Sequence, residues 1–239
     1  MKNVFFTLFF LSSIFLQCQD QNNAVSEQDY LADLKEQMEL EWPKNRVINV
    51  VFHGHSVPAG YFRTPHVNTL AAYPHLFLKY LKEQYPTATI NVITTAIGGE
   101  QSEQGAKRFA EEVLTHQPDL LFIDYALNDR SIGLERSKIA WEQMIRSALS
   151  AGTKVVLLTP TPDLSEDISA EATPLAKHTK MIQELGTQWK IPVVNVYDRF
   201  KQMRAEGTQL SKYMSQGNHP NELGHMVVLL VIADTLFQH

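Results

Sequence analysis

The sequence contains very little cysteine. Only Cys18 among its 239 residues carries a thiol, so no disulfide within the chain can hold a small, loop-rich fold together. Hydrophobic residues make up 44% of the sequence, and a chain of this length and composition can bury one sizeable core. We therefore expect a single domain that is stabilised by packing and not by cross-links.

Basic charge and metal-binding patterns are also scarce. Lys and Arg number 21 against 26 Asp and Glu, which gives a formal net charge of −5. Without a basic stripe to neutralise phosphates, nucleic acid is not an expected partner. The chain has no HExxH motif and no cluster of carboxylates and histidines, although His53 and His55 alternate. A metal hydrolase is therefore a minor alternative, and we expect no metal or organic cofactor.

No apolar run is long enough to span a membrane. The run Val4–Leu16 falls short of the roughly 20 residues that a spanning helix needs. A short apolar run behind Lys2 is typical of an export signal, here residues 1–18. Cys18 stands where bacterial lipoproteins carry their lipid, but residues 15–17 are not the small ones usual there. Lipidation and plain secretion both stay open.

The expected location follows from this segment. We predict an exported protein that is periplasmic, associated with the outer membrane, or extracellular, and that meets a membrane only through a lipid on Cys18. Residues 19–45 are polar and acidic, with a weak helical rhythm from Ser26 to Trp42. This pattern predicts a linker followed by a helix on the edge of the domain, which Pro43 ends. Residues 46–239 form the main domain.

Within the main domain, apolar and amphipathic segments alternate. The predicted strands are Val47–Phe52, Ile90–Thr95, Leu120–Tyr125, Val155–Thr159 and Val193–Tyr197. The predicted helices are Ala71–Gln84, Glu103–Thr115, Leu134–Ser150, Leu175–Trp189 and Glu222–Phe237. Near-continuous apolar strands separated by helices indicate a parallel sheet that is buried on both faces. We predict a three-layer α/β/α domain, whose functional site lies where the strands end.

Four loops at that edge carry polar or conformationally special residues. Ser56 follows the first strand, Gly99 the second and Asn128 the third, and His219 precedes the last helix. Each of these residue types is common in ordinary turns. Together they offer a hydroxyl, a backbone N–H, a side-chain amide and an imidazole on one rim of the sheet. These are the groups that acyl transfer requires.

Each group has a candidate role in ester hydrolysis. A serine hydroxyl is a poor nucleophile until a base takes its proton, and His219 is the candidate base for Ser56. The N–H groups of Ser56 and Gly99 and the amide of Asn128 are candidate donors to the oxyanion. One such donor is typically worth about 3–4 kcal/mol in the transition state.

The four blocks resemble those of the SGNH (GDSL-type) hydrolases, in the order of that family. Ser56 stands in GHSV, Gly99 in AIGGEQS, Asn128 in ALND and His219 in NHPNELGH. The resemblance implies a flavodoxin-like sandwich around a five-stranded parallel sheet. It also implies a carboxylic ester hydrolase without a cofactor. Members of the family are esterases, lipases, thioesterases and carbohydrate deacetylases.

The sequence departs from the family pattern at three positions. His55 stands where the family usually has Asp, and either tunes Ser56 or faces away as a turn residue; alternation along an extended chain favours the second. Ala126 replaces a glycine. Gln216 stands where an Asp usually orients the catalytic His219. Its side-chain oxygen, or a backbone carbonyl, would then have to accept the Nδ1–H.

The substrate itself is less well defined by the sequence. Candidate substrate-binding residues on the rim are His55, Tyr61, Arg63 and Asp129. For Asp129, which follows Asn128 directly, capping a helix or joining loops is the more ordinary role. We expect a secreted or lipid-anchored serine esterase acting on a small-molecule or glycan ester, foremost an O-deacetylase on carbohydrate. Gln216 keeps a non-catalytic binding module open, and a lipase or thioesterase is a further alternative.

Overall fold

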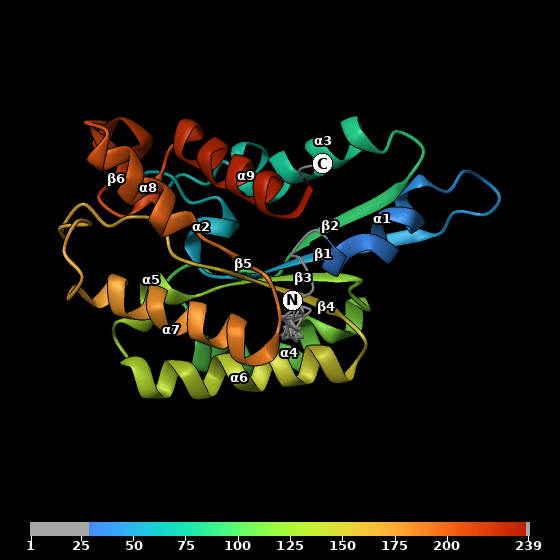
Figure 1. The fold of residues 1–239 in the computed structure, drawn as a ribbon, viewed down its shortest axis with the longest axis horizontal. Coiled ribbons are helices and arrows are strands. Elements are labelled where there is room, and N and C mark those ends of the chain that lie inside the picture. Colours follow the sequence, from blue (N-terminus) through green and yellow to red (C-terminus); the bar gives the residue numbers. More distant parts are fainter. Residues whose placement is uncertain (1–28, 238–239) are drawn as a thin grey trace, which may run out of the picture.

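The computed structural model describes residues 29–237, and within this range one parallel sheet forms the centre of the molecule (Figure 1). Its strands are β1 (Val47–Gly54), β2 (Thr89–Thr94), β3 (Leu120–Asp124), β4 (Lys154–Leu158) and β5 (Val193–Val194). They are arranged in the order β2-β1-β3-β4-β5, and every pair is parallel. This is the flavodoxin-like order, so the predicted fold class is confirmed.

Helices cover both faces of this sheet. The α-helices are α1 (Ala32–Glu39), α2 (Ser56–Ala59), α3 (Tyr73–Gln84), α4 (Ser102–Glu112), α5 (Ala126–Asp129), α6 (Leu134–Ser150), α7 (Pro174–Trp189), α8 (Val196–Ala205) and α9 (Glu222–Phe237). Single 3-10 turns are η1 (Asp29–Leu31), η2 (Thr69–Ala71), η3 (Leu114–His116) and η4 (Leu210–Tyr213). The short helices α2 and α5 come almost directly after β1 and β3.

Alternation along the strands divides the core in two. Val50 and Phe52 of β1 face a cluster built with α1, α3, α8 and α9, whereas Val51 faces a cluster built with α4, α6 and α7. Figure 1 shows α3, α8 and α9 on one side of the sheet and α4, α6 and α7 on the other. The ring of Phe52 stacks on Phe122 of β3 at 4.4 Å between centroids. The expected three-layer sandwich is therefore present.

The C-terminal part of the sheet differs from the prediction. The fifth strand ends at Val194, not at Tyr197, because α8 begins at Val196. Helix α8 buries Tyr197 and Phe200 against the core, so residues that look like the end of a strand belong to a helix. A two-stranded antiparallel hairpin, β6 (Met214–Gln216) with β7 (His219–Pro220), was also not predicted. This hairpin carries His219.

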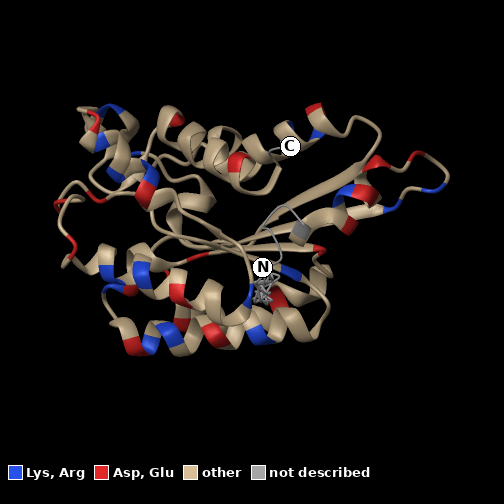
Figure 2. Ribbon diagram, viewed as in Figure 1, with Lys and Arg blue, Asp and Glu red and all other residues tan. Residues whose placement is uncertain are grey.

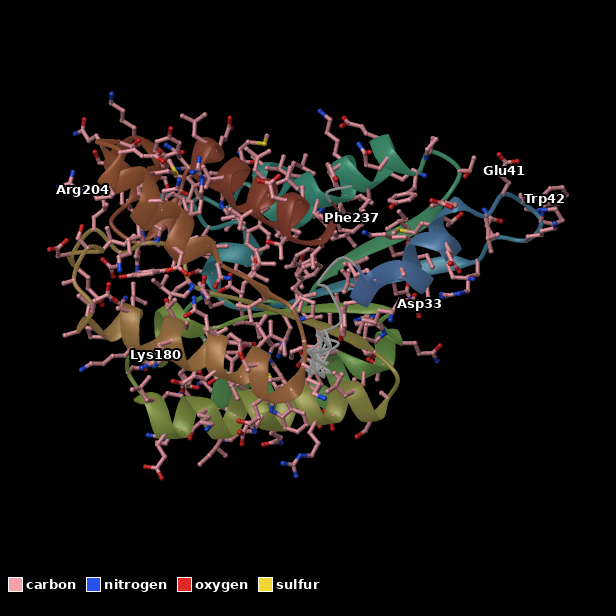
Figure 3. All side chains as sticks on the ribbon, viewed as in Figure 1. Asp33, Glu41, Trp42, Lys180, Arg204 and Phe237 are labelled. Carbon is pink, nitrogen blue, oxygen red and sulfur yellow. The ribbon has the colours of Figure 1, made fainter. Side chains whose placement is uncertain are left out.

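The predicted edge helix is shorter than expected. Helix α1 buries Leu34 and Met38, and it ends at Glu39, so Pro43 is not the residue that stops it. The loop after α1 projects from the molecule and carries Trp42 (Figure 3), whose side chain is 85% exposed. The predicted export signal, with Cys18, lies outside the described residues. Among the helices of residues 29–237, none has the length and apolar content to span a bilayer.

Acidic and basic side chains are intermixed over the outer helices, while the strands of the sheet carry few of them (Figure 2). This mixture is in keeping with the small formal net charge of −5.

The end of β1 is closely packed at Gly54. A Cβ at this position would lie 2.3 Å from the Asp124 carbonyl oxygen and 2.8 Å from Cγ of Pro58. The Gly54 carbonyl also accepts the Ile97 N–H at 3.0 Å, which ties the loop after β2 to the end of β1. Glycine is required here because a side chain would not fit. Its backbone conformation is not the reason, since any residue can adopt it.

The substitution Gly54→Ala should therefore destabilise the protein. Overpacking against fixed backbone typically costs about 1–3 kcal/mol, which for a chain of this size lowers Tm by about 5 °C. Gly217→Ala is the matched control, because a Cβ there meets nothing within 4 Å. Thermal unfolding followed by circular dichroism measures both. Equal Tm values for the two variants would contradict the tight packing at Gly54.

Candidate active site

The structure brings the four predicted residues to one edge of the sheet. Ser56 is the first residue of α2, directly after β1, and Asn128 lies in α5, directly after β3. Gly99 lies in the loop between β2 and α4, and His219 opens β7. The site thus lies where the ends of β1 and β3 meet, at the point of the flavodoxin-like order where ligands commonly bind.

Ser56 and His219 are in direct contact. The Ser56 Oγ lies 2.9 Å from Nε2 of His219, which is a hydrogen-bonding distance. The side chains come from residues 163 positions apart, and both are buried, at 5% and 6% exposure. An imidazole in this position can take the hydroxyl proton during nucleophilic attack.

The other nitrogen of His219 has two neighbours. Its Nδ1 lies 2.8 Å from the carbonyl oxygen of Phe62 and 2.9 Å from Nε2 of Gln216. The Gln216 oxygen accepts the Thr64 N–H at 3.1 Å, and its Nε2 donates to Asn218 Oδ1 at 3.3 Å. The Gln216 oxygen is therefore engaged elsewhere and does not face the imidazole.

The two neighbours of Nδ1 favour opposite tautomers of His219, because the Phe62 carbonyl can only accept a hydrogen bond and the Gln216 amide nitrogen can only donate one. The shorter contact, to Phe62, favours the proton on Nδ1, which leaves the Nε2 lone pair facing Ser56. Of the two acceptors left open by the sequence, the backbone carbonyl is represented by Phe62, which lies within hydrogen-bonding distance of Nδ1. The side chain of Gln216 places its amide nitrogen, and not its oxygen, beside Nδ1.

The environment of His219 keeps it neutral. Burial lowers the pKa of its imidazole below the ordinary value, because the charged form loses its hydration. The hydrogen bond to the Phe62 carbonyl acts in the opposite direction, and a positive charge on the nearby His55 would lower the pKa further. A neutral imidazole near pH 7 is the form that accepts a proton.

The candidate oxyanion donors lie just after β1, β2 and β3. The Ser56 N–H is at the first position of α2 and so has no acceptor within that helix. Gly99 has a φ of +80°, a conformation that favours glycine, and a Cβ there would meet nothing within 4 Å. Asn128 donates one amide hydrogen to the Glu100 carbonyl at 2.9 Å, which leaves its second amide hydrogen for a ligand.

A buried polar network holds the Gly99 loop from below. Arg108 binds both carboxylate oxygens of Glu100, at 2.8 and 2.5 Å. The Tyr125 hydroxyl donates to Glu100 at 2.7 Å and lies 3.1 Å from Nε2 of His53. Burial, with a further contribution from Arg108, lowers the pKa of His53 to about 3, so His53 stays neutral.

The sequence-based reasoning did not assign this network. Tyr125, the last residue of the predicted third strand, has a fully buried side chain. One signal was available: Glu100 follows Gly99 directly, and an acidic residue beside a predicted oxyanion glycine needs a partner if it is buried. Its partner, Arg108, lies in the next helix along the chain.

Tyr61 and Arg63, two of the candidate substrate-binding residues, lie beside the site or at the surface. The Tyr61 ring centroid is 6.1 Å from that of His219, and a Cβ on Gly98 would come within 3.0 Å of the Tyr61 ring. Tyr61 thus bridges the loop after β1 and the loop after β2. Arg63 is exposed. Both remain candidates for substrate contact.

The other two candidates are buried, and the structure corrects their role. The Asp129 carboxylate accepts hydrogen bonds from the Ser102 N–H at 2.7 Å, the Ser137 hydroxyl at 2.6 Å and the Trp141 indole at 2.8 Å. It joins α4, α5 and α6 and has no free face for a substrate. His55 is 1% exposed and turns toward the protein interior.

A metal site is not apparent in the part of the chain that the structure describes. No three or more His, Cys, Asp or Glu side chains of residues 29–237 gather closely enough to hold an ion. His53 contacts Tyr125 and Thr95, while His55 faces Asp124, so the two alternating histidines serve separate contacts.

Comparison with known proteins agrees with this geometry. The family model described as "GDSL-like Lipase/Acylhydrolase family" matches residues 52–227. This match covers most of the chain and includes all four candidate blocks. The chain therefore belongs to the GDSL-like lipase/acylhydrolase family. A comparison with curated protein sequences gives no match.

Solved structures with the same fold include several esterases. A two-domain esterase active on acetylated mannans has a TM-score of 0.73 and 20% identity, covering 86% of this chain and 52% of its own. This chain thus spans about half of that esterase. An acetylxylan esterase variant from Geobacillus stearothermophilus has a TM-score of 0.70 and 15% identity, and the match covers 84% of this chain and 97% of the esterase. A GDSL-like lipase candidate from Parabacteroides merdae has a TM-score of 0.69 and 16% identity, and the match covers 79% of this chain and 94% of that protein.

The network below Gly99 should be essential for stability. Glu100→Gln removes the buried charged partner of the Arg108 guanidinium, which is 12% exposed, and leaves it only the half-exposed carboxylate of Glu112. Breaking a buried ion pair in this way costs about 3–5 kcal/mol, which corresponds to a fall in Tm of about 10 °C. We expect ester hydrolysis to fall as well, because Glu100 positions Gly99 and Asn128.

Glu103→Gln is the matched control for this prediction. It breaks another Glu–Arg pair, with Arg136, but the Arg136 side chain is 58% exposed, and exposed ion pairs contribute little. Thermal unfolding should leave the Tm of this variant nearly unchanged. A Glu100→Gln protein as stable as Glu103→Gln would show that the buried network does not hold the loop.

Proposed function

We propose that this chain is an exported serine esterase that removes acetyl groups from carbohydrate. Membership of the acylhydrolase family gives the class of reaction. The observation that carries the assignment of residues is the contact of 2.9 Å between Ser56 Oγ and His219 Nε2. It is combined with an Nδ1–H that the Phe62 carbonyl holds in place.

In the first half of the proposed reaction, Ser56 Oγ attacks the ester carbonyl and its proton passes to Nε2 of His219. The Phe62 carbonyl keeps the Nδ1–H and so favours the imidazolium that forms. The N–H groups of Ser56 and Gly99 and the Asn128 amide stabilise the oxyanion. The tetrahedral intermediate then expels the alcohol oxygen of the sugar, which takes the proton from His219, and leaves an acyl group on Ser56.

In the second half, water replaces the sugar. His219 takes a proton from the water molecule as its oxygen attacks the acyl carbonyl. Collapse of the second tetrahedral intermediate breaks the bond to Ser56 Oγ, which recovers its proton from His219. Acetic acid leaves and the free enzyme is restored. No redox step and no additional reactant are needed.

Two observations support carbohydrate as the alcohol. The esterase of the same fold that acts on acetylated mannans was also crystallised with mannopentaose. In the acetylxylan esterase of this fold, alanine variants of a serine and of a histidine are described as catalytic mutants. Both proteins share at most 20% identity with this chain, so they support the substrate class and not one polysaccharide.

The surface beside the site has a suitable character for sugars. A hollow of about 510 Å³ is lined in part by Phe62, the residue whose carbonyl contacts His219, and by Asn221, but none of the four candidate catalytic residues lines it. Its other lining residues are His66, Asn68, Glu222 and Leu223. Amide, imidazole and carboxylate groups that converge with an aromatic side chain suit a polyhydroxylated ligand more than a long acyl chain.

Export rests on the N-terminal sequence. The apolar run Val4–Leu16 behind Lys2 is typical of a cleaved signal, and Cys18 is the candidate lipid-bearing residue. A protein delivered outside the cytoplasm would meet polymeric glycan directly. This supports a polysaccharide or oligosaccharide ester as substrate, with location in the periplasm, at the outer membrane or outside the cell.

A non-catalytic binding module is the second candidate function, because Gln216 replaces the carboxylate that usually supports the histidine. The Phe62 carbonyl weakens that objection, since it holds the Nδ1–H without a carboxylate. A lipase or thioesterase of the same family would differ in its preference among acyl chains. Hydrolysis of p-nitrophenyl esters of increasing chain length distinguishes these activities.

The proposed function predicts that Ser56→Ala abolishes ester hydrolysis. With p-nitrophenyl acetate and acetylated mannan or xylan as substrates, we expect the wild-type rate to fall by at least about 10³-fold, because no other group forms the acyl intermediate. EDTA should leave the wild-type rate unchanged. A folded wild-type protein that releases no acetate from any of these substrates would instead support the binding module.

The pH dependence of activity tests the state of His219. Since burial lowers its pKa, the neutral base persists on acidification, and activity should fall to half only below the ordinary value of 6.5. Gln216→Glu places a carboxylate beside Nδ1, which favours the imidazolium and raises the pKa. The acid limb of kcat/KM should then move to higher pH.

Gln216→Ala is the control for this shift. The Phe62 carbonyl remains in that variant, so we expect a loss of less than about tenfold, far below the roughly 10⁴-fold loss when a triad carboxylate is replaced by an amide. Its acid limb should stay close to that of the wild type. An unchanged limb in Gln216→Glu would mean that Gln216 does not contact His219 in solution.

A further inference from the structure

A second buried imidazole, that of His55, lies beside Ser56. His55 is 1% exposed, and its Nδ1 lies 3.5 Å from Ser56 Oγ. Its Nε2 lies 3.3 Å from Oδ1 of Asp124, a carboxylate that is itself buried. The second oxygen of Asp124 accepts the Tyr73 hydroxyl at 3.0 Å. The mechanism above uses none of these three buried side chains.

The contacts of His55 define where its proton resides. Its Nδ1 accepts the Val57 N–H at 3.2 Å and so caps the N-terminus of α2. A nitrogen that accepts a hydrogen bond carries the lone pair, and the proton of the neutral imidazole is therefore on Nε2. That N–H faces the Asp124 carboxylate. The separation of 3.3 Å is an ion-pair distance without the geometry of a hydrogen bond, and neither atom has a hydrogen-bonding partner among the described residues.

We propose that His55 and Asp124 form a buried imidazole–carboxylate pair that positions the nucleophile Ser56. This inference rests on the proposed esterase function and deepens it. The negative charge of Asp124 keeps the proton of His55 on Nε2. The unprotonated Nδ1 then accepts the Val57 N–H and caps α2. This cap fixes the orientation of Ser56, which lies between His55 and Val57 in the sequence. His55 is a positioning residue and exchanges no proton during the reaction.

The short length of α2 makes this cap important. The helix spans only Ser56–Ala59, so it cannot position its first residue through several turns of its own hydrogen bonds. Its start is defined by the cap at Val57 and by β1. A displacement of Ser56 by about 1 Å is enough to cost about 10²-fold in rate, because Oγ must stay within reach of His219.

The pair also explains a departure of the sequence. His55 stands where the family usually has an aspartate, and an aspartate there would lie beside Asp124, so two carboxylates would be buried together. An imidazole caps the helix without adding a second negative charge. The carboxylate of Asp124 thus reaches Ser56 only through the side chain of His55. His219, by contrast, has only the neutral Phe62 carbonyl and Gln216 amide beside its Nδ1.

Asp124→Asn is the sharpest test, because it conserves size and still accepts the Tyr73 hydroxyl. The new amide N–H₂ would face Nε2 of His55 and drive the imidazole proton to Nδ1, where it opposes the Val57 N–H. We expect kcat for p-nitrophenyl acetate to fall by about 10–100-fold, with KM changed by less than about threefold because the substrate contacts remain.

A double-mutant cycle shows whether the two residues act through each other. His55→Asn keeps a capping oxygen but is too short to reach Asp124, and we expect a similar loss of kcat. The double variant should lose little more than either single variant, because both disrupt one unit. Additive losses would show two independent structural effects and would overturn the pair.

His225→Asn is the matched control. His225 is also a buried imidazole whose Nδ1 accepts a backbone N–H, that of Tyr73 at 3.2 Å, but its contacts do not include Ser56. We expect His225→Asn and His55→Asn to lower Tm by similar amounts. The kcat of His225→Asn should change by less than about threefold, whereas that of His55→Asn should fall as described above. Equal kcat losses in both would assign the effect to general destabilisation and overturn the proposal.

A readout independent of activity separates this inference from the esterase function. Long-range ¹H–¹⁵N spectra of the wild type near neutral pH should show His55 protonated on Nε2 alone, and Asp124→Asn should move that proton to Nδ1. If the wild type is inactive but shows this tautomer, the esterase function fails and the pair stands. A wild-type His55 protonated on Nδ1 overturns the pair, whatever the activity.

Discussion

The end of β1 at Gly54 is the constraint on which the site depends. Gly54 pairs with Asp124 of β3, and its carbonyl accepts the Ile97 N–H from the loop after β2. Because the approach is too close for any side chain, three strands end at one point. Ser56 follows this junction by two residues, and the oxyanion candidates follow Ile97 and Asp124 by a few residues. A shift at Gly54 would therefore separate the nucleophile from its donors.

Much of the fold could be predicted from the sequence because the signals are local. The apolar strands of a parallel sheet and the amphipathic helices between them have distinct periodicities, and β1 to β4 were located within one or two residues. The hairpin that carries His219 and helix α8 were missed. The apolar stretch from Val193 to Tyr197 fits a strand as well as a strand followed by a helix, and packing of Phe200 decides between them.

The candidate site was only partly predictable, and the reason is that its support is not local. Chain order was enough to select Ser56 and His219, which the structure places 2.9 Å apart. The candidate acceptor of the His219 proton is the backbone carbonyl of Phe62. Because every residue has a backbone carbonyl, the sequence cannot indicate which one fills this role. Asp129 and His55 looked like rim residues, but buried partners far along the chain turn both toward the interior.

The central claim is that Ser56 is a nucleophile activated by His219. Incubation of the full-length protein with a fluorophosphonate, followed by peptide mass spectrometry, tests it most directly, because the reagent forms a stable bond to an activated serine. We predict a single adduct on Ser56, which is lost in His219→Ala while that protein remains folded. A folded wild type without an adduct on Ser56, or with an adduct on another residue, would contradict the account.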